Sequence, residues 1–399
     1  MPTILQINVT ANWGSTGKIA EQIGQCAMKH GWNSYIAYGR WCNSSESHLI
    51  KVGNFLDILC HYGVQKIRDN EGLCSCIATK FLVKKIKEIN PSIIHLHNIH
   101  DHYLNYKILF EYLNSTDIKV VWTFHDCWAI TGHCFHFVSR NCERWKSICY
   151  KCPLQHEYPK TMLDRSKKNY LLKKYLFTNN KNLTIVACSE WIGNLVSKSF
   201  LKDKPIYVIH NGIDLKVFRN SKNLIDNNQK EMYRILAVSN VWNKDKGYDD
   251  IINLRKLLPD DCEISIIGVT KKQQDDLPLG IMGIQRTQNV NDLVKLYSNA
   301  DVLINPTYAD TFPTVNLEAL ACGTPVVTYR TGGSPEAIDR KTGIVVEQGD
   351  INGLAEAILQ LRKKPLSSTD CRKRVEEFFD KDKCYSSYIR LYENLCGIK

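Results

Sequence analysis

The chain has 399 residues, of which 44% are hydrophobic and 23% are charged, and this balance is that of a globular protein, not of a disordered one. Its length allows two or three domains with sizeable cores. Lysine and arginine total 52 against 41 acidic residues, a net charge of +11 that favours anionic partners such as nucleotides, anionic lipid or nucleic acid. No apolar run reaches the roughly eighteen residues of a membrane span.

The cysteine count is high, at sixteen, and its meaning depends on the compartment. In a secreted chain so many cysteines would indicate disulfides. Residues 1–9, however, lack the basic segment of a secretory signal and are predicted to form a strand. We therefore expect a cytoplasmic protein with reduced thiols.

The first predicted strand is followed by a loop that contains the tetrapeptide GSTG, from Gly14 to Gly17. A helix follows, with Ile19 and Ile23 on one face. Strand, glycine loop and helix form an arrangement that lets the backbone approach a phosphate, although glycines there also permit a tight turn. Residues 34–38 are predicted to form a second strand.

A long segment, residues 54–88, is predicted to be helical and is rich in lysine near its end. One interpretation is a solvated helix face, the usual meaning of a charge run. The other is a basic amphipathic surface that docks on an anionic leaflet. A second basic cluster adds weight to the membrane interpretation without deciding it. The lysines concerned are Lys80, Lys84, Lys85, Lys87, Lys167, Lys168, Lys173 and Lys174.

Two further predicted strands end in histidines. Residues 92–97 carry His95 and His97 on one face, because side chains alternate along a strand. Residues 120–124 lead to His125 and Asp126. A metal site is the weaker interpretation of these histidines, since a histidine that follows a strand is usually structural.

The segment that follows is unusual in its cysteines, which are separated by 7, 6 and 2 residues. A closing C-x-x-C after two earlier cysteines suits a structural zinc ion with four thiolate ligands. Because the spacing differs from that of common zinc ribbons, other interpretations remain open: buried free thiols, a disulfide pair, or a histidine, His133 or His136, as substitute ligand. The cysteines are Cys134, Cys142, Cys149 and Cys152.

The second half begins after a polar stretch, residues 220–231, which is predicted to be a loop. A strand is expected at residues 234–239, and a loop with Lys244 and Lys246-Gly247 comes next. Further strands are predicted at residues 263–268 and 343–346, and further helices near residue 290 and at residues 354–362, 371–379 and 383–395.

Residues 301–338 form the most informative stretch, with the order strand, loop, helix, strand, loop, helix. Thr311 is predicted to cap the first helix and Ser334 the second. Helix starts at the carboxyl ends of parallel strands present N–H groups that favour phosphate. Asp310 and Glu318, with seven residues between them, are expected to flank one ligand.

This stretch resembles the nucleotide-sugar half of a GT-B glycosyltransferase of the retaining family 4, through its acid-x7-acid element and its GTPVV…GGSPE tail. The NGID sequence at residues 211–214 is similar to the family's crossing between its two halves. The family usually has glutamate and glycines where this chain has Asp310-Thr311-Phe312-Pro313, and an aspartate with TFP is similar to a branch of the family. The cysteine-rich insertion is similar to one in the exopolysaccharide branch.

The resemblance implies an α/β GT-B fold, with two Rossmann-like domains whose parallel sheets face each other across a cleft. Residues 1–208 would form the acceptor-side domain, with the cysteine-rich insertion at residues 127–156. Residues 209–380 would bind the nucleotide sugar. Residues 381–399 would form a helix that returns to the first domain.

The resemblance also assigns roles to residues. Glu318 would hold the ribose hydroxyls and Asp310 those of the transferred sugar, Lys246 would neutralise the leaving diphosphate, and His125 would line the reacting face. Asn240 stands where the family often has arginine. The implied catalytic residues are His125, Asp310 and Lys246. The implied nucleotide-sugar contacts are Gly14, Gly17, Lys244, Lys246, Arg286, Thr287, Asp310, Thr311, Phe312, Pro313, Thr314, Val315 and Glu318.

The implied activity is retaining transfer of a hexosyl or N-acetylhexosaminyl group from a UDP- or GDP-type donor to a glycan or lipid-linked acceptor, in cell-surface polysaccharide synthesis. Catalysis is expected to need no metal cofactor, and no nucleic acid is expected as a partner. Contact with the inner face of an anionic membrane is expected. Two alternatives come from other classes. One is a GT-B relative that acts without an acceptor, such as an epimerase or hydrolase. The other is a nucleic-acid-binding protein that uses a zinc module.

Overall fold

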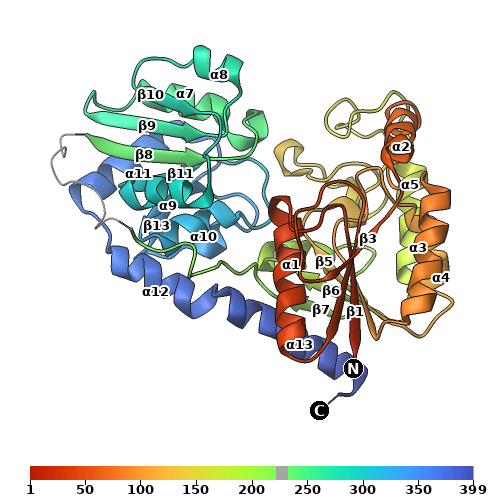
Figure 1. Cartoon of the computed structure of the whole chain (residues 1–399). Coiled ribbons are helices and arrows are strands. Elements are labelled where there is room, and N and C mark those ends of the chain that lie inside the picture. Colours follow the sequence, from red (N-terminus) through yellow and green to blue (C-terminus); the bar gives the residue numbers. More distant parts are fainter. Residues whose placement is uncertain (222–231, 399) are drawn as a thin grey trace. The chain divides into compact units, whose positions relative to one another are not determined.

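The computed structural model describes residues 1–221 and 232–398 and separates the chain into two compact units. The N-terminal unit comprises residues 1–210 together with the end of the chain from Cys384, and the C-terminal unit comprises residues 211–383. Figure 1 shows the elements of each unit. The predicted polar loop at residues 220–231 lies, from residue 222 onward, outside the described residues.

The sheet of the N-terminal unit has seven parallel strands in the order β3-β2-β1-β4-β5-β6-β7. The strand order reverses between β1 and β4, so the carboxyl ends of these strands mark the switch point at which such sheets bind ligands. The strands are β1 (Thr3–Asn8), β2 (Asn33–Tyr38), β3 (His48–Lys51), β4 (Ile93–Leu96), β5 (Lys119–Phe124), β6 (Leu183–Ala187) and β7 (Ile206–Val208).

Helices cover this sheet, and the last one completes its core. Tyr385, Tyr388 and Tyr392 of α13 are buried against Ile4 of β1 and Ile23 of α1. The helices are α1 (Gly14–Lys29), α2 (Phe55–Arg68), α3 (Cys76–Ile89), α4 (Tyr106–Leu113), α5 (Ser166–Thr178), α6 (Glu190–Val196) and α13 (Lys381–Cys396), with short turns η1 (Trp128–Ile130), η2 (Val138–Arg140) and η3 (Arg144–Lys146).

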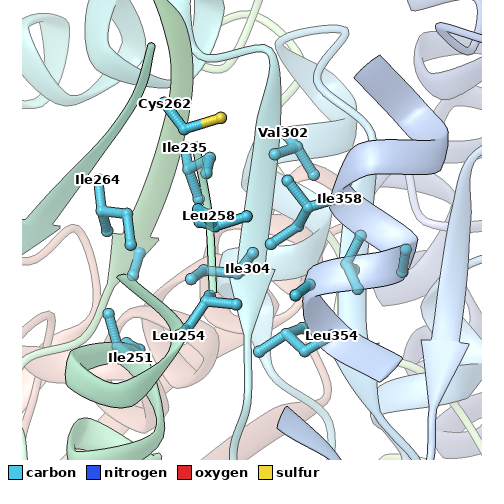
Figure 2. Close-up of a cluster of buried hydrophobic side chains, with 14 of the residues drawn as sticks. Ile235, Ile251, Leu254, Leu258, Cys262, Ile264, Val302, Ile304, Leu354 and Ile358 are labelled. Carbon is cyan, nitrogen blue, oxygen red and sulfur yellow. The ribbon is translucent and has the colours of Figure 1, made fainter. Parts of the chain in front are cut away.

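The sheet of the C-terminal unit has six parallel strands in the order β10-β9-β8-β11-β12-β13, with its switch point between β8 and β11. Figure 2 shows Ile235, Ile264 and Ile304 of the strands facing Leu254 of α7 and Leu354 of α11 in its core. The strands are β8 (Tyr233–Val238), β9 (Cys262–Ile267), β10 (Ile281–Ile284), β11 (Val302–Asn305), β12 (Val326–Tyr329) and β13 (Gly343–Val346).

Polar caps begin several helices of this unit. Asn289 accepts a hydrogen bond from the Asp292 N–H at the start of α9, and Asp350 accepts one from the Gly353 N–H at the start of α11. The helices are α7 (Tyr248–Arg255), α8 (Lys271–Asp275), α9 (Val290–Asn299), α10 (Thr314–Ala321), α11 (Ile351–Lys363) and α12 (Ser368–Phe378), with short turns η5 (Lys244–Lys246) and η6 (Ser334–Ala337).

Most predicted strands are confirmed, but several helix predictions are wrong in detail. Residues 54–88 form two helices, because Asp69 adopts a left-handed conformation that ends α2. Thr311 does not cap α10, which begins at Thr314 after Pro313 and has no side-chain cap. Ser334 opens only the single turn η6. Finally, α1 begins at Gly14, inside the predicted loop.

Candidate active site

Loops that follow β8, β11 and β12 are tied together at one edge of the C-terminal sheet. The Tyr308 N–H donates to the Asp245 carbonyl at 2.8 Å, and the Gly333 N–H donates to the Thr311 carbonyl at 3.1 Å. Because β8 and β11 flank the switch point, these loops line the place where an open α/β sheet binds its ligand.

Lys246 and Asp310 form an ion pair across this switch point. The Lys246 Nζ lies 2.7 Å from Asp310 Oδ2 and donates to the Ala309 carbonyl at 3.2 Å. Lys246 ends η5, after β8, whereas Asp310 lies in the loop after β11. The two side chains are 33% and 22% exposed, so both remain accessible to a ligand. The structure thus brings together two of the three predicted catalytic residues.

Two glycines let the backbones of these loops approach closely. Gly247 has φ +71°, and a Cβ there would lie 2.2 Å from the Pro306 carbonyl oxygen. Gly332 has φ +54°, and its Cβ would lie 1.7 Å from the Asp310 carbonyl oxygen. Only glycine fits both the conformation and the space. The loop after β12 therefore packs directly on the backbone of Asp310.

Glu318 lies half-buried on α10, where its Oε2 accepts a hydrogen bond from the Tyr297 hydroxyl at 2.7 Å. Burial and the Glu318 carboxylate raise the pKa of Tyr297 well above its usual value, so the phenol remains a donor. The buried Asn316 accepts from the Asn305 amide and donates to the Ser334 hydroxyl, each at 2.9 Å. These bonds fix α10 relative to β11 and η6.

The remaining predicted contacts divide into buried and exposed residues. Thr311, Phe312 and Pro313 are buried, and the Phe312 ring packs 5.6 Å from that of Phe379. Thr314 and Val315 form the half-buried first turn of α10. Lys244 and Arg286 are exposed, and Thr287 is half-buried, in loops at the same edge of the sheet.

The N-terminal unit holds the third predicted catalytic residue, His125, in a histidine cluster. His97 Nδ1 lies 3.0 Å from His125 Nε2, and His97 Nε2 lies 3.0 Å from Gln6 Oε1. The rings of His95 and His97 are 4.0 Å apart, which confirms that they share one face. Burial lowers the pKa of His125 to about 4 and that of His97 well below its usual value, so both rings are neutral near pH 7.

A histidine–aspartate pair, which sequence reasoning did not predict, lies beside this cluster. His100 Nε2 lies 2.8 Å from Asp126 Oδ2. Burial opposes a charge on His100, yet the Asp126 carboxylate raises its pKa above the usual value. Both residues line a pocket of about 190 Å³, part of it open to solvent, together with His97 and His125. The sequence spacing gave no sign of the pairing, because its two members follow different strands.

The glycine loop lies after β1, on the other side of the N-terminal switch point. Gly14 has φ +66°, and a Cβ at Gly17 would lie 2.5 Å from Thr10 Oγ1. The Thr10 hydroxyl in turn donates to the Trp13 carbonyl at 2.7 Å. The positive φ of Gly14 and the close approach of Thr10 to Gly17 within α1 account for both glycines, and a phosphate contact remains a prediction.

The four cysteines of the insertion are free thiols that line one pocket. The disulfide interpretation is therefore wrong for this structure. Within residues 1–221 and 232–398, no group of three or more His, Cys, Asp or Glu side chains is placed so that it could hold a metal ion as it stands.

Two parallel, doubly wound units with polar clusters at their switch points have the architecture of GT-B proteins, and comparisons with known proteins identify the family. Family models for glycosyltransferase family 4 and for glycosyl transferases group 1 match residues 22–217 and 233–364. The chain belongs to this family of glycosyltransferases.

The relatives and solved structures are distant but extend over most of the chain. The putative colanic acid biosynthesis glycosyl transferase WcaC of Escherichia coli is 23% identical over 98% of this chain and 100% of its own. The capsular polysaccharide biosynthesis glycosyltransferase CapM of Staphylococcus aureus is 27% identical over 52% of this chain and 60% of its own.

Among solved structures, sucrose-phosphate synthase of Thermosynechococcus elongatus superposes with a TM-score of 0.75 at 17% identity, covering 100% of both chains. Anabaena Alr3699/HepE in complex with UDP superposes with a TM-score of 0.69 at 13% identity, covering 99% of this chain and 100% of its own. These likenesses show the shared fold. None of the helices in the described part of the chain is long and apolar enough to cross a membrane.

Proposed function

We propose that this glycosyltransferase moves a hexosyl or N-acetylhexosaminyl group, with retention of configuration, from a UDP- or GDP-type donor to a glycan or lipid-linked acceptor during cell-surface polysaccharide synthesis. The names of the colanic acid and capsular relatives support the pathway. Complexes of the HepE neighbour with UDP and UDP-glucose support a nucleotide-sugar donor and favour UDP.

The observation that carries the proposal is the Lys246–Asp310 pair at the switch point of the C-terminal unit. When a nucleotide sugar breaks, negative charge builds on the departing diphosphate. The Lys246 ammonium and the N–H groups that open α10 would stabilise that charge, which is preorganised electrostatic catalysis. Asp310 would accept hydrogen bonds from the sugar hydroxyls, and Glu318 from the ribose hydroxyls.

The catalytic role of His125 is part of the same proposal. Its ring is neutral and held by His97, so it can exchange hydrogen bonds with a sugar without adding charge. Because Lys246 and α10 meet the charge of the diphosphate, the reaction as proposed uses no metal cofactor. Retention follows from the family resemblance, and no protein nucleophile is assigned.

We propose further that the N-terminal unit docks on an anionic membrane surface, where a lipid-linked acceptor would lie. Helix α2 exposes Phe55 by 74% and Leu56 by 67%, together with Leu59 and Ile67. Exposed apolar side chains on one helix mark an interaction surface. Arg68 adds positive charge at the end of the same helix, as an anionic leaflet requires.

The lysines that first indicated a membrane surface contribute unequally. Lys80, Lys84 and Lys87 of α3 are exposed, whereas Lys85 pairs with Glu88 at 2.7 Å. Lys173 is buried, so the second basic cluster is smaller than the sequence predicts. The apolar face of α2, with Phe55 and Leu56, is therefore the stronger support for docking.

The test of the donor assignment is calorimetry with UDP-, GDP-, ADP- and dTDP-sugars. We expect selective binding of one nucleotide, its loss in Glu318→Ala, and its retention in Glu356→Ala, a change at an exposed glutamate of α11. An unchanged affinity in a folded Glu318→Ala variant would overturn the role of Glu318. Sugar release in the absence of any acceptor product would favour a hydrolase or epimerase over a transferase.

A further inference from the structure

The cysteine-rich insertion has little regular secondary structure. Between Thr131 and Arg165 the described structure has only the short turns η2 and η3. Its apolar contacts centre on Phe137 and Trp145, whose rings stack at 5.0 Å. A segment with so small a core usually needs a covalent or metal staple. The four thiols, which form no disulfide, face one pocket of about 310 Å³, part of it open to solvent.

Backbone groups already approach the sulfurs in this pocket. The Gly132 N–H donates to Cys149 Sγ at 3.3 Å. Gly132 is required there, because a Cβ would lie 2.1 Å from the Ser166 carbonyl oxygen and 2.9 Å from Cys149 Cβ. A backbone donor of this kind orients a sulfur ligand.

His133 presents an unpartnered donor or acceptor to the same pocket. Its Nδ1 lies 2.6 Å from Asp69 Oδ1. Its Nε2 is buried without a hydrogen-bond partner, although the ring lines the pocket. A buried polar group left unpaired costs about 1–3 kcal/mol. The unpaired nitrogen marks the pocket as a polar site that lacks a partner.

Lys173 of α5 is buried beside the pocket, and burial lowers its pKa to about 7. It is 1% exposed, and its Nζ donates to the carbonyls of Trp128 at 2.7 Å and Thr131 at 3.1 Å. Among the described residues, no carboxylate lies within ion-pair distance of it. The two backbone contacts of Lys173 hold α5 against the segment that leads into the pocket.

We propose that this pocket binds a structural zinc ion through Cys134, Cys142, Cys149 and Cys152, with the His133 ring lining the same pocket. Each cysteine releases its proton to solvent as its sulfur bonds the metal. The thiols do not yet converge on one point, so binding draws them together. All four belong to a loop segment whose side chains can turn without breaking a helix. The site is independent of the proposed function.

The test is elemental analysis of the full chain, purified with reductant, without chelator, from zinc-supplemented medium. We expect one zinc per chain, released by a mercurial reagent and detected with a metal-binding dye. Cys149→Ser and Cys152→Ser should lose the metal, whereas Cys60→Ser, a change at an exposed thiol of α2, should retain it.

A second measurement covers variants that fail to fold. The wild-type chain, stripped of zinc and titrated with Co²⁺, should develop the visible absorption of tetrahedral cobalt–thiolate coordination. A wild-type chain that contains no zinc and shows no such absorption overturns the proposal. Loss of zinc in a folded His133→Ala variant, with all four cysteines present, would overturn the four-thiolate ligand set.

Discussion

His97 and His125 share a hydrogen bond of 3.0 Å between Nδ1 of the first and Nε2 of the second. The Gln6 side-chain nitrogen donates to the Ala20 carbonyl, so Gln6 Oε1 is left to accept a hydrogen bond from His97 Nε2–H. Since burial keeps both rings neutral, His97 Nδ1 must be the acceptor and His125 Nε2 the donor. Gln6 therefore sets the tautomer of His125 through His97.

Replacing Gln6 by leucine should release this constraint. We expect kcat to fall about tenfold, because a buried partner is worth about 1–3 kcal/mol, while the KM for the donor stays unchanged. Steady-state kinetics and nitrogen chemical shifts of the histidine rings would measure the two effects. Gln25→Leu, on α1, is the control. An unchanged rate together with an altered tautomer would show that the tautomer set by Gln6 does not affect catalysis.

Replacing Lys246 and replacing Asp310 should cause two different defects. Lys246→Met should weaken binding of the nucleoside diphosphate about tenfold or more, because a charge-assisted contact is worth about 1.5–3 kcal/mol. Asp310→Asn should keep that affinity and lose transfer of the sugar. Calorimetry with the diphosphate, set beside a transfer assay, separates them, and Lys271→Met on α8 is the control. Equal losses of affinity in both variants would contradict the division of roles.

Gly332 should tolerate no side chain. Gly332→Ala places a Cβ 1.7 Å from the Asp310 carbonyl oxygen at φ +54°, which combines overlap with a strained backbone. We expect a loss of about 2–4 kcal/mol in the free energy of unfolding, together with weaker donor binding. Gly63→Ala, in α2 with no atom within 4 Å of the new Cβ, should instead stabilise by about 0.5–1 kcal/mol. Urea unfolding compares the two.

Buried histidines should make the N-terminal unit sensitive to acid. Burial lowers the pKa of His61 and His125 to about 4, and those of His95 and His97 well below their usual value. Between pH 6.5 and 4 the unfolded chain therefore binds more protons, and stability falls as pH falls.

Each such group contributes about 1.4 kcal/mol per pH unit within that window. His102 has the opposite effect on the pH dependence of stability. Its pKa is raised to about 9 by Asp101 and Glu71 against the effect of burial, so its contribution is present below pH 6.5 and is lost as pH rises through 9. Melting temperatures measured from pH 4.5 to 9.5 should show a maximum near neutrality. His48→Gln, a change at an exposed histidine, is the control. A melting temperature that does not fall as pH is lowered from neutrality to 4.5 would contradict the prediction.

The apolar face of α2 should govern membrane binding. The double change Phe55→Ser and Leu56→Ser should lower partitioning into anionic vesicles at least tenfold, since each buried apolar side chain contributes about 1.5–3 kcal/mol. Vesicle co-sedimentation measures the loss. Leu279→Ser, which alters a leucine that is 98% exposed in the C-terminal unit, should leave binding unchanged. Equal binding by both variants would argue against this surface.

Local sequence patterns predicted most of the strands and the order of the donor-side motif, but not the strands β3 and β10. Local sequence pattern is enough for a short apolar strand such as β13, which was predicted with its observed bounds. The spacing of Asp310 and Glu318 fixes one in a loop and the other on α10, since both belong to one loop–helix unit. The zinc prediction likewise arose from local spacing.

Contacts between side chains far apart in the sequence depend on the tertiary structure. Lys246 reaches Asp310 over 64 residues, and His97 reaches Gln6 over 91, because β8 lies beside β11 and β1 beside β4 in their sheets. Asp69 meets His133 in the same way, 64 residues away. Strand order and loop packing create these contacts, and no local pattern encodes them. For the same reason the pKa values of the histidines, which depend on burial and partners, emerged only from the folded chain.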